Sequence, residues 1–170
     1  MKYLEYHAAE WDQIFKDEFN NIHFLLPDMK LKVEHIGATS VSGSHSFRNV
    51  DIMIATSSFA DIYSAKMMLS VSGYKEMPEL GNDQCVVVVK QKKYHKIGVT
   101  LRIVEYGSDM YNSFTQFKNL LQTDYHRVNE YNEFRDNLFE EVNKDIKEYN
   151  KKKYAYIIKM VETDWNSEQE

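Results

Sequence analysis

The chain has 170 residues, a formal net charge of −5, 43% hydrophobic residues and 28% charged residues. This length is that of one ordinary domain, and the apolar fraction excludes a disordered chain. The acidic balance argues against a general nucleic-acid binder, because neutralising phosphates requires a local surplus of Lys and Arg. The two short basic clusters, at 92–96 and 151–153, are therefore predicted to be solvated surface.

The single cysteine, Cys85, excludes an intramolecular disulfide, and the first residues lack the apolar run of a signal peptide. The longest aliphatic run, Val86–Val89, is far shorter than the roughly 20 residues that span a bilayer. We therefore expect a cytoplasmic protein with no membrane anchor.

The first half of the chain predicts one helix and two strands. Apolar residues recur at helical spacing over 11–22, which indicates an amphipathic helix. Residues 31–36 alternate between apolar and polar and stop at Gly37, as a half-buried strand does. Residues 50–55 also alternate, so Asp51 is placed on the face opposite the three aliphatic side chains of that strand. That face is expected to line a cleft.

A second helix and a hairpin are predicted next. Ser58, followed three residues later by Asp61, is typical of a helix cap. Its inner side is expected to carry the apolar residues Phe59, Ile62, Tyr63, Met67 and Leu69. Residues 84–90 and 97–104 are rich in β-branched residues and read as a hairpin.

The C-terminal third is predicted to be helical, because apolar residues recur at helical spacing from residue 114 to residue 160. No repeat or Pro/Gly-rich linker interrupts the chain. We therefore expect a single α/β (α+β) domain over residues 1–163, followed by a polar tail at 164–170.

The segment that runs from Glu34 to Gly43 is the best candidate for chemistry. A strand runs into Gly37 and then into small residues, which leaves room for backbone N–H groups to meet a phosphate. The chain has neither a Walker lysine nor a three-glycine fingerprint here, so an ordinary turn is the alternative explanation.

The wider pattern resembles the signature of the GrpB family: residues 33–43, with 50–54 behind them. Further segments match in the same order, at 101–108 and 117–121, so the resemblance covers almost the whole chain. It implies a nucleotidyltransferase-like fold, with a small mixed β-sheet flanked by helices. In such a fold a Gly-Ser turn holds phosphates and strand carboxylates bind magnesium.

This chain departs from the family pattern at several positions. Ala38 replaces the serine of the turn, although the hydroxyls of Thr39 and Ser40 remain, and Arg48 stands near the position of a family lysine. Paired histidines of the family correspond to Thr100 and Arg102, which removes two ligand or acid–base groups. The phosphate-binding residues that the resemblance implies are Gly37, Ala38, Thr39, Ser40, Arg48 and Arg102.

Magnesium chemistry needs two or three converging carboxylates. Asp51 is the expected catalytic residue and metal ligand, and Glu34 on the neighbouring strand is the second metal-ligand candidate, with an exposed strand carboxylate as its simpler interpretation. Met53 stands where the wider superfamily has a second carboxylate, and a thioether cannot replace it for a hard cation. The histidines form no HxH or HExxH spacing, so we do not expect a zinc site.

Three functions remain open. The favoured one is a module with a degraded catalytic site that binds a nucleotide, a phosphate metabolite or a coenzyme-A-related molecule. Coenzyme A enters only because domains similar to this family occur fused to dephospho-coenzyme A kinase. The second is a Mg²⁺-dependent nucleotidyltransferase or phosphoryl-transfer enzyme, and the third is a protein-interaction module formed by the C-terminal helices.

Overall fold

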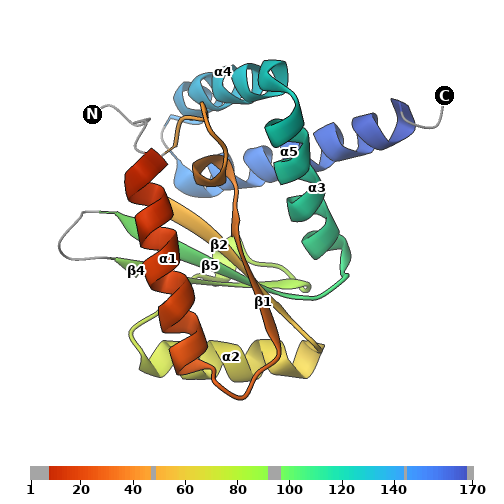
Figure 1. The fold of residues 1–170 in the computed structure, drawn as a ribbon. Coiled ribbons are helices and arrows are strands. Elements are labelled where there is room, and N and C mark those ends of the chain that lie inside the picture. Colours follow the sequence, from red (N-terminus) through yellow and green to blue (C-terminus); the bar gives the residue numbers. More distant parts are fainter. Residues whose placement is uncertain (1–7, 47–48, 92–96, 144, 168–170) are drawn as a thin grey trace.

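The computed structural model describes residues 8–46, 49–91, 97–143 and 145–167 (Figure 1). In chain order the elements are α1 (Ala8–Leu25), β1 (Leu31–Ile36), η1 (Ala38–Ser40), β2 (Asn49–Thr56), α2 (Phe59–Val71), β3 (Lys75–Glu76), η2 (Pro78–Leu80), β4 (Cys85–Gln91), β5 (Gly98–Glu105), α3 (Asp109–Thr123), α4 (Tyr125–Glu141) and α5 (Ile146–Ser167). Within these ranges, no helix combines the length and the apolar character needed to cross a bilayer.

The five strands form one mixed sheet in the order β1-β2-β5-β4-β3. Only β2 and β5 run parallel, and the other neighbours are antiparallel. The predicted strand at 31–36 is confirmed as β1, and the predicted hairpin is confirmed as β4 and β5. The expected fold class, a small mixed sheet flanked by helices, is confirmed as well.

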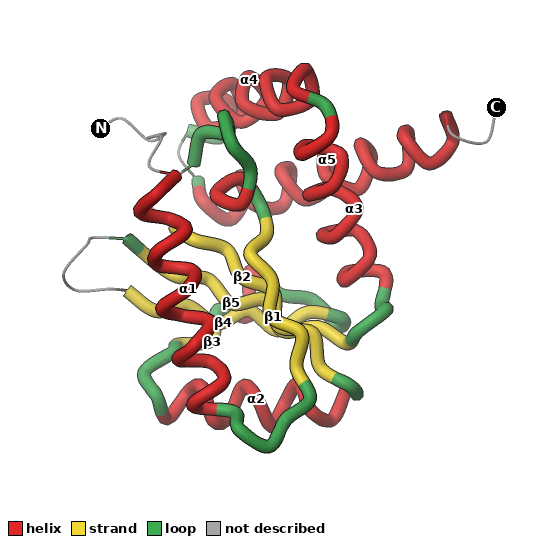
Figure 2. The backbone as a smooth tube through the Cα atoms, viewed as in Figure 1, coloured by secondary structure: helices red, strands yellow, loops and turns green. Residues whose placement is uncertain are grey.

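Helices α1 and α2 cover one face of the sheet (Figure 2). Trp11 and Ile22 of α1 and Leu69 of α2 are buried in the same cluster as the aliphatic residues of β2 and β5. The oxygen Oγ of Ser58 accepts a hydrogen bond from the N–H of Asp61 at 3.3 Å, so the predicted helix cap is confirmed.

The predicted inner side of α2 is wrong for three of its five residues. Phe59, Tyr63 and Met67 are 48%, 48% and 68% exposed. The buried residues of this helix are Ile62, Ala65 and Leu69. These three recur at spacings of three and four residues and form one stripe, whereas Phe59, Tyr63 and Met67 are four residues apart and form another, exposed stripe.

Helices α3, α4 and α5 lie on the other side of the sheet (Figure 1). Met53 of β2 packs with Phe114 of α3 there, and α4 and α5 form further clusters beyond α3. Asp51 belongs to this face, opposite the aliphatic side chains of β2, as predicted. Helix α5 continues into the segment expected as a polar tail, and Asp164 accepts a 2.6 Å hydrogen bond from Arg127.

Candidate functional site

A cavity of about 320 Å³ lies between the second face of the sheet and helices α3, α4 and α5. This volume is at the lower end of the range of small-molecule sites. Its charged lining residues are Asp51, Arg102, Arg135 and Lys153. Aromatic side chains from the three helices form much of the remaining wall: Phe114, Phe117, Tyr131, Tyr149 and Tyr154.

Asp51 and Arg102 meet because β2 and β5 are parallel neighbours. Asp51 is paired with Thr100 and Met53 with Arg102, so their side chains project from the same face of the sheet. Nη2 of Arg102 lies 3.6 Å from Oδ1 of Asp51. Burial lowers the pKa of Arg102, but the acidic groups Tyr154, Asp51 and Cys85 raise it, and the net direction is upward. Arg102 therefore points into the cavity and is charged there.

The guanidinium of Arg102 is packed between two aromatic rings. Its Cζ lies 5.7 Å from the ring centroid of Phe114 and 5.2 Å from that of Tyr154, within the range of cation–π contacts. Nη1 of Arg102 and Oη of Tyr154 are both buried and have no hydrogen-bond partner in the described part of the chain. An unsatisfied buried polar group costs about 1–3 kcal/mol, so these two atoms are donors that the protein leaves unpaired at that cost.

Arg135 of α4 is held in place by a hydrogen-bond network with the loop that precedes β2. Its Nη2 donates to Oδ1 of Asn132 at 2.6 Å and to Oγ of Ser44 at 3.2 Å. Asn132 in turn donates to the carbonyl oxygen of Gly43 at 3.0 Å. Among the described residues, no carboxylate forms an ion pair with Arg135. The positive charge is thus fixed at the cavity wall without a counter-charge.

Lys153 of α5 supplies the third cation. Burial is the largest influence on its pKa, which is lowered to about 8; Asp51 raises the pKa, and Arg102 and Arg135 lower it. Its Nζ lies 5.7 Å from the ring centroid of Tyr149. Three cationic side chains and one carboxylate therefore converge on the cavity, so its lining has an excess of positive formal charge.

The glycine turn reaches the cavity with only part of its length. Gly37 has φ 68° and ψ −164°, a conformation that is nearly restricted to glycine, and its position lies against the Asp51 side chain. Gly37 and Ala38 line the cavity, but Thr39 and Ser40 do not.

The hydroxyls of Thr39 and Ser40 are engaged within the turn itself. Oγ1 of Thr39 lies 2.8 Å from Nε2 of the buried His35, and Oγ of Ser40 donates to the carbonyl oxygen of Gly37 at 2.7 Å. Both residues border a different pocket, which residues of α1, α3 and α4 also line. The structure therefore separates them from the other expected phosphate-binding residues, and Arg48 lies outside the described residues.

Glu34 also lies apart from Asp51. It is paired with Met53 in the sheet, whereas Asp51 is paired with Ile36. Its carboxylate contacts Nζ of Lys32 at 2.5 Å and accepts a 3.5 Å hydrogen bond from Oη of Tyr111. In the described ranges, no group of three or more His, Cys, Asp or Glu residues is arranged to hold a metal ion, and Asp51 is the single carboxylate lining the cavity.

Three residues of the cavity were missed in the sequence: Arg135, Lys153 and Tyr154. A signal was present in the spacing of α5, since Tyr149, Lys153 and Ile157 are four residues apart and lie on one face. A lysine inside such an apolar stripe indicates a partly buried cation. The prediction of a solvated surface for the whole run 151–153 is therefore wrong for Lys153.

Comparisons with known proteins support the fold. The family model described as GrpB protein matches residues 3–163. The crystal structure of the conserved protein GrpB from Enterococcus faecalis is similar with a TM-score of 0.77 and 22% identity, over 98% of both chains. The Cid1 poly(U) polymerase bound to MgATP is similar with a TM-score of 0.51 and 9% identity, over 70% of this chain and 38% of that one. At these identities the likeness concerns the fold alone. No curated protein matches the sequence significantly.

Proposed function

This chain belongs to the GrpB family, and we propose that it binds a small molecule that carries a phosphate, such as a nucleotide or a related phosphate metabolite. The observation that carries the proposal is the convergence of Arg102, Arg135 and Lys153 on one cavity that contains a single carboxylate. Neither a cation nor a neutral ligand would offset this excess of positive charge.

The charge and the walls of the cavity both suit a nucleotide-like ligand. The excess of two positive charges matches a phosphate monoester, which carries about −1.5 to −2 at pH 7. The aromatic walls offer flat apolar surfaces for a base or another ring. A volume of about 320 Å³ favours a small ligand.

We propose further that the site for metal-dependent transfer is degraded. Magnesium needs several oxygen ligands, and two-metal transfer needs more than one carboxylate. Asp51 stands alone here, with Nη2 of Arg102 at 3.6 Å, and Met53 offers only a thioether. The donor set does not fit two magnesium ions. The alternative, a Mg²⁺-dependent nucleotidyltransferase, is favoured by the fold alone.

The Asp51→Asn variant separates the two functions. In a binding module this substitution removes the carboxylate that repels the ligand. Two unit charges about 4 Å apart interact by about 4 kcal/mol at an effective dielectric constant of about 20. A longer separation and solvent screening reduce this repulsion, so we expect about tenfold tighter binding. In a magnesium enzyme the same variant loses magnesium-dependent binding and turnover. Isothermal titration calorimetry with nucleoside monophosphates and triphosphates, each with and without Mg²⁺, measures the difference.

Two lysines of α5 provide a second test and its matched control. Lys153→Met is expected to weaken binding because it removes a cation from the cavity, whereas Lys159→Met removes an exposed cation of the same helix and leaves affinity unchanged. Weaker binding in Asp51→Asn, or equal effects of the two lysine variants, contradicts the proposal.

A further inference from the structure

We propose that the cavity holds the dianionic end of a phosphate monoester between Nη1 of Arg102 and Oη of Tyr154. This inference rests on the proposed function and assigns its ligand group to a definite place. The place lies on the side of β5 and α5, away from the turn at 37–40 where the family resemblance puts phosphates.

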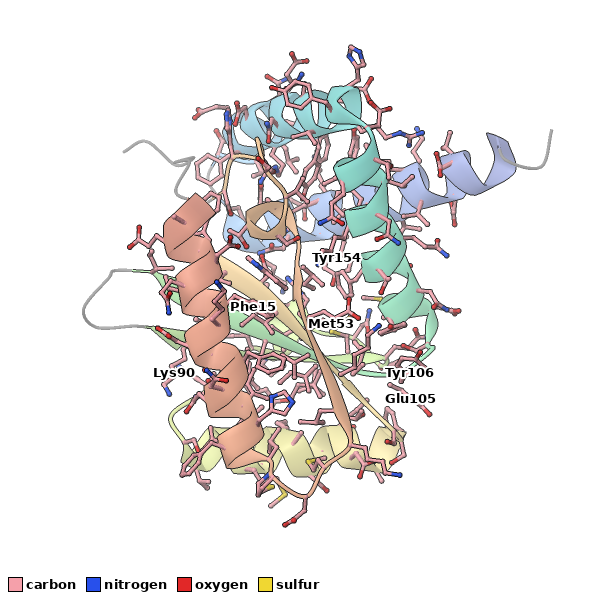
Figure 3. The ribbon with its side chains drawn as sticks, viewed as in Figure 1. Phe15, Met53, Lys90, Glu105, Tyr106 and Tyr154 are labelled. Atoms are coloured by element: carbon pink, nitrogen blue, oxygen red, sulfur yellow. The ribbon has the colours of Figure 1, made fainter. Side chains whose placement is uncertain are left out.

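The two atoms are the unpartnered buried polar groups described above, and their side chains are fixed neighbours. Arg102 is 4% exposed, and its Cζ lies 5.2 Å from the ring centroid of Tyr154. Tyr154 makes an edge contact with Phe114, with ring centroids 5.4 Å apart and planes at 80°. Its side chain lies between α5 and the sheet (Figure 3). Packing holds both donors in position before any ligand arrives.

The chemistry of these two groups selects an oxyanion. A guanidinium has donors and no acceptor. Burial raises the pKa of Tyr154, so its phenol keeps its proton at neutral pH and can donate it. Two unpaired donors, one of them cationic, favour a ligand whose oxygens carry negative charge, because charge-assisted hydrogen bonds are the stronger ones. Phosphate and carboxylate oxygens meet this condition, whereas an alcohol oxygen is uncharged and an ammonium group has no acceptor.

The surrounding charges favour a dianion over a monoanion. Arg135 and Lys153 line the same cavity, and each contributes a positive charge beyond the pair of Arg102 with Asp51. A terminal phosphate monoester offsets both, while a carboxylate or a phosphodiester offsets only one.

The turn is a poorer place for the same group. Ser40 donates its hydroxyl to the carbonyl oxygen of Gly37, and Thr39 is engaged with His35. Ala38 has no hydroxyl. The turn can therefore contribute backbone contacts to the ligand, but the two free side-chain donors lie at Arg102 and Tyr154.

The Tyr154→Phe variant is expected to lower affinity without lowering stability. The hydroxyl has no partner in the free protein, so its removal is expected to leave the melting temperature unchanged or to raise it. A hydrogen bond to a charged group contributes roughly tenfold or more to binding. We therefore expect at least a tenfold loss of affinity for inorganic phosphate and for a nucleoside monophosphate in calorimetry. Tyr63→Phe, at an exposed tyrosine on α2, is the matched control and changes neither quantity.

Four outcomes overturn the inference. A lower melting temperature for Tyr154→Phe shows that the hydroxyl is satisfied in the free protein. Unchanged affinity in Tyr154→Phe, with weaker binding in Lys153→Met, contradicts the assigned place of the phosphate but not the proposed function. Equal affinity for a nucleoside monophosphate and for its cyclic phosphodiester contradicts the preference for a dianionic group. If no phosphate compound binds to the wild-type protein, both the proposed function and the assigned phosphate position are contradicted.

Discussion

The affinity of the cavity for an anion is predicted to fall between pH 7 and pH 9, because Lys153 loses its proton there. Its pKa is lowered to about 8 by burial and by Arg102 and Arg135. Lysine is charged below its pKa, so about 90% of Lys153 is protonated at pH 7 and about 10% at pH 9.

The magnitude follows from this change in protonation. If only the charged form of Lys153 binds the anion, the affinity at pH 9 is about a tenth of that at pH 7. The ligand does not share in the change, because the second pKa of a phosphate monoester is about 6. Burial also raises the pKa of Tyr154, so its hydroxyl stays protonated over this range.

Isothermal titration calorimetry at pH 7, 8 and 9 with a nucleoside monophosphate measures the effect. Lys153→Arg keeps its charge throughout, so we expect its affinity to stay constant across the range. Lys153→Met should bind weakly and also without pH dependence. A constant affinity of the wild-type protein from pH 7 to pH 9, or a slope that persists in Lys153→Arg, refutes the assignment of the titrating group.

Two further predictions concern the turn beside the cavity. Burial, with a smaller contribution from Lys118, lowers the pKa of His35 to about 4 from 6.5. The folded protein therefore favours the neutral ring: the stabilisation is complete above pH 6.5 and is lost as the pH falls from 6.5 to 4. It amounts to about 3 kcal/mol. Because His35→Gln lacks this titrating group, its free energy of unfolding in urea should fall less between pH 7 and pH 4.5 than that of the wild-type protein. An equal fall in both proteins speaks against a buried neutral ring. Gly37→Ala should lower the free energy of unfolding by about 1–3 kcal/mol through backbone strain, and a neutral effect in the same assay contradicts the conformation described for Gly37.

Local patterns in the sequence were sufficient for the strands that form one side of the site. The alternation of residues 50–55 placed Asp51 on the cavity face of β2, and Gly37 marked the end of β1. These features depend on neighbours within a few residues, because side chains of a strand alternate between its two faces. The sequence could not show whether Arg102 faces the cavity, since that depends on which strands are adjacent.

The helical wall of the site depends on contacts between distant segments. In the run 151–153, Lys152 pairs with Glu141 at 2.5 Å and Lys151 is exposed, whereas Lys153 points to the cavity. Consecutive helical residues point about 100° apart, so the run as a whole has no single environment. The packing of α5 on α3 and α4 decides which lysine turns inward. The run 151–153 alone does not show it, and only the wider spacing of Tyr149, Lys153 and Ile157 indicates Lys153.

Residues far apart in the sequence build the cavity, from Ile36 on β1 to Ile157 on α5. A nascent chain therefore has no complete site until α5 is synthesised and docked against α3 and α4. Any ligand that contacts Lys153 and Tyr154 stabilises that docking step, since binding to the native state alone favours it. Ligand binding is then expected to slow both hydrogen exchange and proteolysis of α5.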